Sequence, residues 1–213
     1  MFALIVDTIP ISFQICDEKL RITNVNPRFP GSTHDAHIWH NSNISQVMEQ
    51  LYRNDANNVF YLLGDSGIFS FSHTIFRSSK RVVSGYPLRP WLLTPLLDVE
   101  ENTPEERFNN SFKRLRSLIE QCNGLLKARF RCLLKHRVLH YLPTKAANIV
   151  NACAVLHNMC IENNDVVDDV DANIEDLHMY PYVPQNEIYF PGHPDLAAAK
   201  QIQHNLVVTM FTE

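Results

Sequence analysis

Four carboxylates in this sequence could hold metal ions: Asp7, Asp35, Asp65 and Glu120. Asp7 and Asp65 each follow a short apolar run, as residues at the ends of strands do, whereas Glu120 lies inside a long helical pattern. Carboxylate oxygens suit Mg²⁺ or Mn²⁺. Two such ions about 3.5–4 Å apart can activate the attacking oxygen and stabilise the leaving oxygen of a phosphodiester reaction. Gathered in space, these carboxylates would form a two-metal site.

Each of these acids, taken alone, also fits an ordinary structural role. An Asp after a strand is most often a turn residue or a helix cap, and a Glu in mid-helix is usually solvated. Arg116, Glu120, Gly124 and Lys127 share one helix face by their spacing. That face fits a functional site or an ordinary salt-bridged surface, and spacing alone does not decide between them.

The elements that would position the acids begin with strands. Asp17 to Lys19 indicate a turn, and the run 59–63 is typical of a strand buried on both faces, which delivers Asp65 at its end. Three β-rich segments before that run predict an antiparallel meander: residues 2–6, 9–16 and 20–25. With the helices that follow, the pattern predicts an α/β fold with a mixed sheet flanked by helices.

Three helices are expected. One occupies the second half of residues 33–51. The next begins at Thr103-Pro104 and runs to about Lys127, and the last covers 145–161. The last helix is apolar on most sides and is expected to be buried. The segment 87–95 contains three prolines and should be a loop.

Bulk properties restrict the class of protein. The 213 residues suit one domain, or one domain with a tail, and the net charge of -4 gives no global basic field. Residues 113–145 are nevertheless strongly basic, and residues 162–176 strongly acidic. The five cysteines contain no CxxC pair, which favours a reducing compartment. No apolar run has the length of a membrane span, so we expect a soluble intracellular protein.

Several motifs in order resemble the Harbinger transposase-derived nuclease family, a DDE superfamily endonuclease of the PIF/Harbinger type. The resemblance covers about residues 1–165. The motifs are PGSTHD at 30–35, GDSG at 64–67, YPLRPWLLTP at 86–95, ERFN at 106–109, IE at 119–120, GLLK at 124–127, RFRCL at 129–133 and AVLHNMC at 154–160. Their order makes the resemblance far more specific than any single motif.

This resemblance implies an RNase H-like core with a DDE-type acidic site and a divalent metal, Mg²⁺ or Mn²⁺. Asp65 matches the second acid and Glu120 the third, and Asp35 is an additional metal-ligand candidate. Asp7 is the match to the first acid, although it lacks the Gly and His that follow that acid in the family. The implied catalytic residues are therefore Asp7, Asp65 and Glu120, and the implied metal ligands are these three with Asp35.

The sequence departs from the family pattern in three places. Asp7 lies almost next to the strand segment 9–16, where the family has a longer connection, so the true first strand is either here or missing. Residues 68–85 separate two motifs that adjoin in the family, and they are interpreted as a lineage-specific insertion or as the translation of an unspliced stretch. The family's N-terminal helical region is expected to be absent, because the chain begins at the catalytic domain.

A basic set flanks Glu120. On a nuclease, these side chains would neutralise DNA phosphates, and otherwise they are solvated helix faces. The DNA-binding candidates are Lys113, Arg116, Lys127, Arg129 and Arg131. Phe130 and Cys132 are expected in the core, and His157-Asn158 should cap or pin the last helix.

Two functional hypotheses follow. The first is a metal-dependent nuclease domain over residues 1–165, followed by an acidic, largely irregular tail over 166–213 in which residues 196–211 could form one helix. The second is a domesticated or decayed transposase domain that binds DNA, or a Myb-like partner protein, without cutting. A product that does not fold stably is a third possibility. The resemblance and a DNA substrate imply the nucleus, with the cytoplasm as an alternative, and no membrane.

Overall fold

A computed structural model describes residues 2–9, 12–27, 35–54, 60–64, 86–134, 139–165 and 194–212. For residues 2–9, 12, 13, 35 and 36 it describes the backbone alone. The chain forms two compact units. Unit 1 comprises Met1–Thr33 and Ser111–Val183, and unit 2 comprises His34–Asn110 and Pro184–Glu213. Both contain helices and strands, which confirms the α/β prediction; the RNase H-like arrangement stays a prediction.

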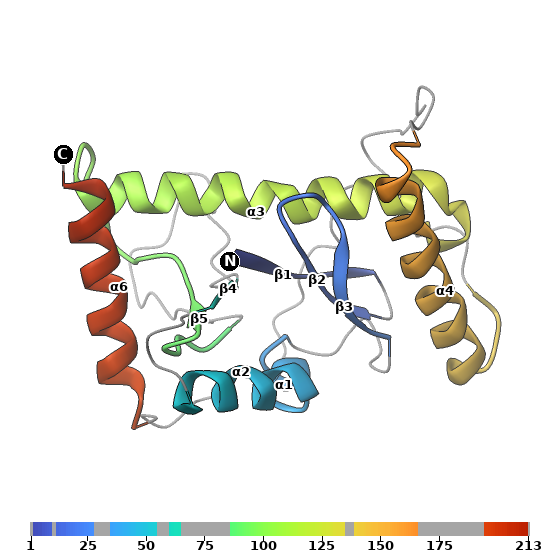
Figure 1. The fold of residues 1–213 in the computed structure, drawn as a ribbon, viewed down its shortest axis with the longest axis horizontal. Coiled ribbons are helices and arrows are strands. Elements are labelled where there is room, and N and C mark those ends of the chain that lie inside the picture. Colours follow the sequence, from blue (N-terminus) through green and yellow to red (C-terminus); the bar gives the residue numbers. More distant parts are fainter. Residues whose placement is uncertain are drawn as a thin grey trace, which may run out of the picture. The chain divides into compact units, whose positions relative to one another are not determined.

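The sheet of unit 1 is an antiparallel meander, as the sequence predicts. Strand β1 (Phe2–Ile9) pairs with β2 (Ser12–Cys16), and β2 pairs with β3 (Ile22–Asn26) (Figure 1). Ile15 and Cys16 are buried, which is the expected position of apolar residues in a central strand. The predicted turn at Asp17 joins β2 to β3.

Two long helices and one 3-10 turn, η1 (Arg131–Leu133), complete the described part of unit 1. Helix α3 (Pro104–Arg129) begins in unit 2 and enters unit 1 at Ser111. Its start follows the sequence signal, because the Glu106 N–H donates to the Thr103 hydroxyl at 3.2 Å. Helix α4 (Pro143–Glu162) packs against β3.

Unit 2 combines helices α1 (Asp35–His40), α2 (Asn43–Asn54) and α6 (Leu196–Phe211) with a two-strand parallel pair. Strand β4 (Tyr61–Leu63) matches the predicted buried strand, and β5 (Leu92–Leu93) runs parallel to it. The expectation that 87–95 is entirely loop was therefore wrong at Leu92–Leu93. The prolines there, Pro87, Pro90 and Pro95, lie outside this short pairing, so the ladder loses no donor.

Three other expectations need correction. Helix α4 was expected to be buried, but one of its sides is not: Val155, Leu156 and Met159 are exposed. Cys132 is exposed rather than in the core, and Phe130 is only half-buried. By contrast, the helix that the sequence allowed at 196–211 does form, as α6, and it buries Ala199, Gln203 and Val207. The interpreted insertion at 68–85 lies outside the described residues.

Candidate functional site

Helix α3 positions Glu120, the candidate acid whose side chain the structure describes. Ile119 and Cys122, on either side of it in the sequence, are completely buried, whereas Glu120 is exposed. The buried neighbours fix the rotation of this part of α3, because their face must stay against the core. Glu120 can therefore meet a ligand without first being moved out of an apolar environment.

Of the other three acids, the structure describes Asp7 and Asp35 by their backbone alone. Asp7 lies in β1, opposite Phe13 of β2, and Asp35 is the first residue of α1. Asp65 follows Gly64 and lies outside the described residues. Glu120 and Asp7 belong to unit 1, whereas Asp35 and Asp65 belong to unit 2. Their shared role in one metal site stays a prediction.

The backbone that leads to Asp65 is held closely. The Gly64 N–H donates to the carbonyl of Leu93 at 2.9 Å, so the parallel pairing with β5 continues to the residue before the acid. A Cβ on Gly64 would lie 2.8 Å from Cγ of Tyr86, which is buried. Only glycine allows the backbone to pass this ring without a shift. The first Gly of the GDSG motif is thus explained by packing.

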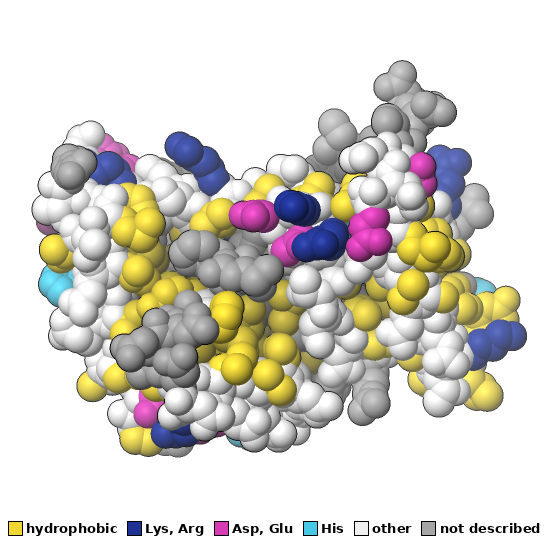
Figure 2. All heavy atoms as spheres, viewed as in Figure 1, with side chains coloured by type: hydrophobic (Ala, Val, Ile, Leu, Met, Phe, Trp, Pro, Cys, Tyr) yellow, Lys and Arg dark blue, Asp and Glu magenta, His cyan; other side chains and the backbone are white. Residues whose placement is uncertain are grey.

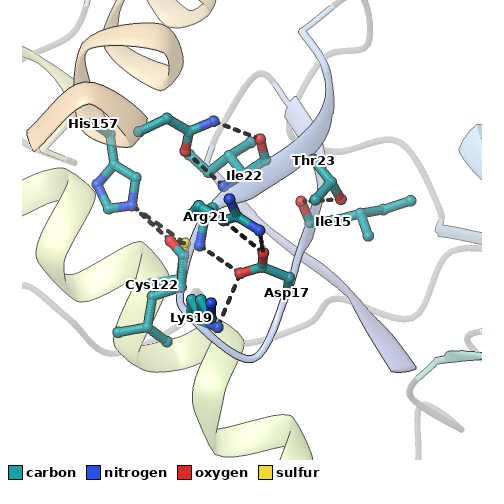
Figure 3. Close-up of polar contacts among 10 residues, drawn as sticks. Ile15, Asp17, Lys19, Arg21, Ile22, Thr23, Cys122 and His157 are labelled. Carbon is teal, nitrogen blue, oxygen red and sulfur yellow. Dashed lines mark hydrogen bonds and ion pairs between the residues drawn. The ribbon is translucent and has the colours of Figure 1, made fainter. Parts of the chain in front are cut away.

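A buried histidine connects α4 with α3 and the β2–β3 turn. The Arg129 guanidinium lies 3.3 Å from His157 Nδ1, and because it can only donate, Nδ1 accepts. The proton is then on Nε2, which lies 2.8 Å from the carbonyl of Leu20 and 3.8 Å from Cys122 Sγ (Figure 3). His157 therefore joins three segments of unit 1, which confirms the predicted pin.

Asn158 makes the second half of this connection. Its carbonyl accepts from the Ile22 N–H at 2.8 Å, and its amide donates to the Ile22 carbonyl at 2.8 Å. The side chain thus satisfies both backbone groups of one β3 residue, as a neighbouring strand would. These two bonds fix the position of α4 along β3.

The five DNA-binding candidates differ in their surroundings. Lys113 and Arg131 are exposed, whereas Arg116 is half-buried. Lys127 is buried, and the loss of hydration lowers its pKa. Arg129 donates to His157 and also to the Asp165 carbonyl at 2.7 Å. Both bonds occupy the Arg129 guanidinium with protein groups, although a DNA contact of any of the five stays a prediction.

A buried polar cluster around Cys122 was missed by sequence reasoning. Gln14 Nε2 donates to Cys122 Sγ at 3.4 Å, and Cys122 Sγ donates to the Leu20 carbonyl at 3.3 Å. A hydrogen bond from Cys16 lowers the pKa of Cys122 and raises the pKa of Cys16. A Gln in the middle of a β-rich run was the available signal, since such a residue needs a partner when buried.

Comparison with known families settles the relationship. The model of the DDE superfamily endonuclease family matches residues 11–158. This chain belongs to the DDE superfamily endonucleases. The matched segment contains Asp35, Asp65 and Glu120, whereas Asp7 precedes it. DDE superfamily endonucleases generally use divalent metal ions.

The family relatives confirm the Harbinger resemblance. The human protein "Putative nuclease HARBI1" is 33% identical over 150 residues, which cover 70% of this chain and 36% of that protein. HARBI1 of Xenopus laevis is 29% identical over 174 residues, 78% of this chain and 44% of that protein. "Protein ALP1-like" of Arabidopsis thaliana is 25% identical over 162 residues, 71% of this chain and 35% of that protein. This chain thus spans less than half the length of these relatives. No solved structure matches it.

Proposed function

We propose that this chain contributes the catalytic domain of a divalent-metal-dependent nuclease of the Harbinger transposase-derived type, which hydrolyses DNA phosphodiester bonds. The observation that carries the proposal is the family match over residues 11–158, because three of the four candidate acids lie within it. The curated relatives that carry the name of a nuclease support it. The antiparallel meander and the parallel strand pair are both parts that an RNase H-like core combines.

The donor chemistry fits a divalent metal. All four candidates are carboxylates, which are the ligands that Mg²⁺ and Mn²⁺ prefer, and Glu120 is exposed. Among the described residues, no group of three His, Cys, Asp or Glu could hold a metal ion. As the family motifs imply, we expect Glu120 to share the ions with Asp65 and with Asp35 or Asp7. A bound metal would supply an activated water and stabilise the leaving oxygen.

The remaining roles belong to cationic side chains of the chain itself. Lys113 and Arg131 are exposed and can reach phosphates of a DNA backbone. Such contacts would orient the strand without reading its sequence.

A DNA substrate places the protein in the nucleus, and a Myb-like partner protein would supply sequence recognition. None of the helices that the structure describes combines the length and the hydrophobicity that a membrane span needs.

Metal binding is the first test. Calorimetric titration of Mg²⁺ or Mn²⁺ into the purified chain should give saturable binding that Glu120→Gln weakens at least about tenfold, since one charged ligand is lost. Glu105→Gln, on the first turn of the same helix, should bind as the wild type does. No saturable binding by the wild type, or equal binding by Glu120→Gln, would mean that the carboxylates do not form a site.

Cleavage is the second test. With Mn²⁺ or Mg²⁺ present, wild-type protein should cut duplex DNA, and Asp65→Asn and Glu120→Gln should each reduce the rate by about a hundredfold or more, since the loss of a mere partner of a metal ligand already costs about 10–100-fold. Equal rates for all three proteins would refute the nuclease assignment. DNA binding without any cleavage by the wild type would instead favour a domesticated binding domain.

A further inference from the structure

Helix α4 has an exposed apolar stripe opposite the face that packs in unit 1. Val155 is 61% exposed, Leu156 47% and Met159 52%. On the other side, Val150, Cys153 and His157 are buried. In Figure 2, hydrophobic side chains also reach the surface over α4, at the right of the view. A helix whose two faces are both apolar is incomplete until the second face is covered.

The spacing of the exposed positions indicates what kind of element covers it. Six exposed residues follow one another at intervals of three, four, three, four and three: Lys145, Asn148, Ala152, Val155, Met159 and Glu162. This is the a/d spacing with which one helix packs along another, knobs into holes. Leu156 flanks the centre of the stripe. The stripe therefore suits another helix rather than a loop or a small molecule.

The charges on α4 point to the identity of that helix. Lys145 and Glu162 are its only Lys, Arg, Asp or Glu residues, and they lie at opposite ends of the stripe. Lys145 is held there by the ring of Tyr141, whose centroid is 4.3 Å from Nζ. A helix with a positive first turn and a negative last turn is complementary to itself when the two run antiparallel.

We propose that this face of α4 binds α4 of a second copy of the chain in an antiparallel, two-fold symmetric pair. In antiparallel pairs, an a position meets a d position of the partner helix. Centred between Ala152 and Val155, this register brings Lys145 against Glu162 at both ends. Asn148 then meets Met159, and Ala152 meets Val155. The small Ala152 lets the helices approach closely at the centre.

The size of the contact sets its strength. One helix pair buries little area compared with the interfaces of permanent dimers. The dimer is therefore reversible, and its population depends on protein concentration. This proposal does not depend on the nuclease assignment, because it uses only the exposed face of α4.

Sedimentation velocity of the full chain over a hundredfold concentration range tests the proposal, with reductant present because Cys132 is exposed. The wild type should shift from monomer to dimer. Val155→Asp should stay monomeric at every concentration, because it places two carboxylates at the centre of the contact. Val208→Asp, at a 49% exposed valine of α6, is the matched control and should dimerise as the wild type does. Circular dichroism checks that both variants remain folded.

Charge exchange tests the antiparallel register. Lys145→Glu alone and Glu162→Lys alone should each weaken self-association at least about tenfold, since like charges then meet at both ends. Their one-to-one mixture should form a heterodimer, and the double variant carrying both changes should regain the wild-type affinity. A wild type that is monomeric throughout, a dimer that is insensitive to Val155→Asp, or a double variant no better than the singles would overturn the proposal.

Discussion

The turn between β2 and β3 depends on one buried carboxylate. Asp17 Oδ1 accepts from the N–H groups of Lys19 and Arg21, each at 2.9 Å, and Arg21 Nη2 lies 2.7 Å from Oδ2 (Figure 3). These contacts hold Leu20 at φ 61°, a left-handed conformation that costs a non-glycine residue about 1–2 kcal/mol. The turn in return presents the Leu20 carbonyl, which His157 and Cys122 both contact.

Asp17 should make the stability of the protein depend on pH. Burial raises its pKa, but the hydrogen bonds from Arg21 and Lys19 and the charge of Arg21 outweigh burial and lower it overall. Its stabilising effect is therefore complete above the unfolded pKa of about 3.9 and is lost as the pH falls through the folded pKa. Asp17→Asn should cost about 1–3 kcal/mol at pH 7, and this deficit should shrink towards pH 3.

Urea unfolding at pH 7 and at pH 3 measures this difference. Glu18→Gln, at the exposed neighbouring carboxylate, serves as the control and should change the free energy of unfolding by less than about 0.5 kcal/mol. The same deficit for Asp17→Asn at both pH values would show that the carboxylate charge has no part in holding the turn.

At the scale of elements, a two-residue motif decides how α4 sits on the sheet. His157 reaches the β2–β3 turn and Asn158 pairs with the backbone of Ile22 in β3. Apolar packing alone would let a helix slide along a strand, since the hydrophobic contact is not directional. The directional bonds of Asn158 remove this freedom, and they leave the opposite face of α4 exposed.

Asn158→Ala should destabilise the chain by about 1–3 kcal/mol, because the N–H and C=O of Ile22 lose the partner that they have on α4. Asn151→Ala, at an exposed position two turns earlier on the same helix, should stay within about 0.5 kcal/mol of the wild type. Thermal and urea unfolding of the two variants give the comparison. A loss at Asn158 no larger than that at Asn151 would contradict the pinning role.

At the scale of the whole molecule, the C-terminal helix is part of unit 2. Gln203 Nε2 of α6 donates to the Thr94 carbonyl at 2.6 Å, just after β5. The rings of Phe211 and Phe108 meet edge to face at 6.0 Å, and Arg53 of α2 lies 3.2 Å from Asp195. Residues more than 100 positions apart in the sequence thus complete one core.

Truncation after residue 193 should therefore expose the core of unit 2. We expect a loss of about 3 kcal/mol or more, since several buried side chains leave together, and a fall in Tm of roughly 6–12 °C for a chain of this size. Differential scanning fluorimetry measures the fall, and binding of a hydrophobic dye reports the exposed surface. Met210→Ala, at an exposed position of α6, is the control. An unchanged Tm in the truncated chain would mean that α6 contributes no stability.

The sequence predicted those parts of the candidate site that depend on patterns among neighbouring residues. Motif spacing selected Glu120, and the Thr103 cap and the apolar stripe placed it on one continuous helix. The sequence did not predict that Lys127 is buried or that Arg129 is bonded to protein groups, because both look like ordinary exposed cations in a basic stretch. The burial of Lys127, and the bonds of Arg129 to His157 and Asp165, depend on segments distant in the sequence.

The sequence by itself determined the family, the antiparallel meander, the buried strand β4 and the long helix α3, because periodicity, turn residues and caps act over a few neighbouring residues. Tertiary structure alone decided which face of α4 is covered, the pairing of Leu92–Leu93 with β4, and the inclusion of α6 in a core. These features depend on contacts between residues far apart in the chain. An apolar helix such as α4 has the same pattern whether its second face meets its own chain or another, so only the fold shows that this face is left open.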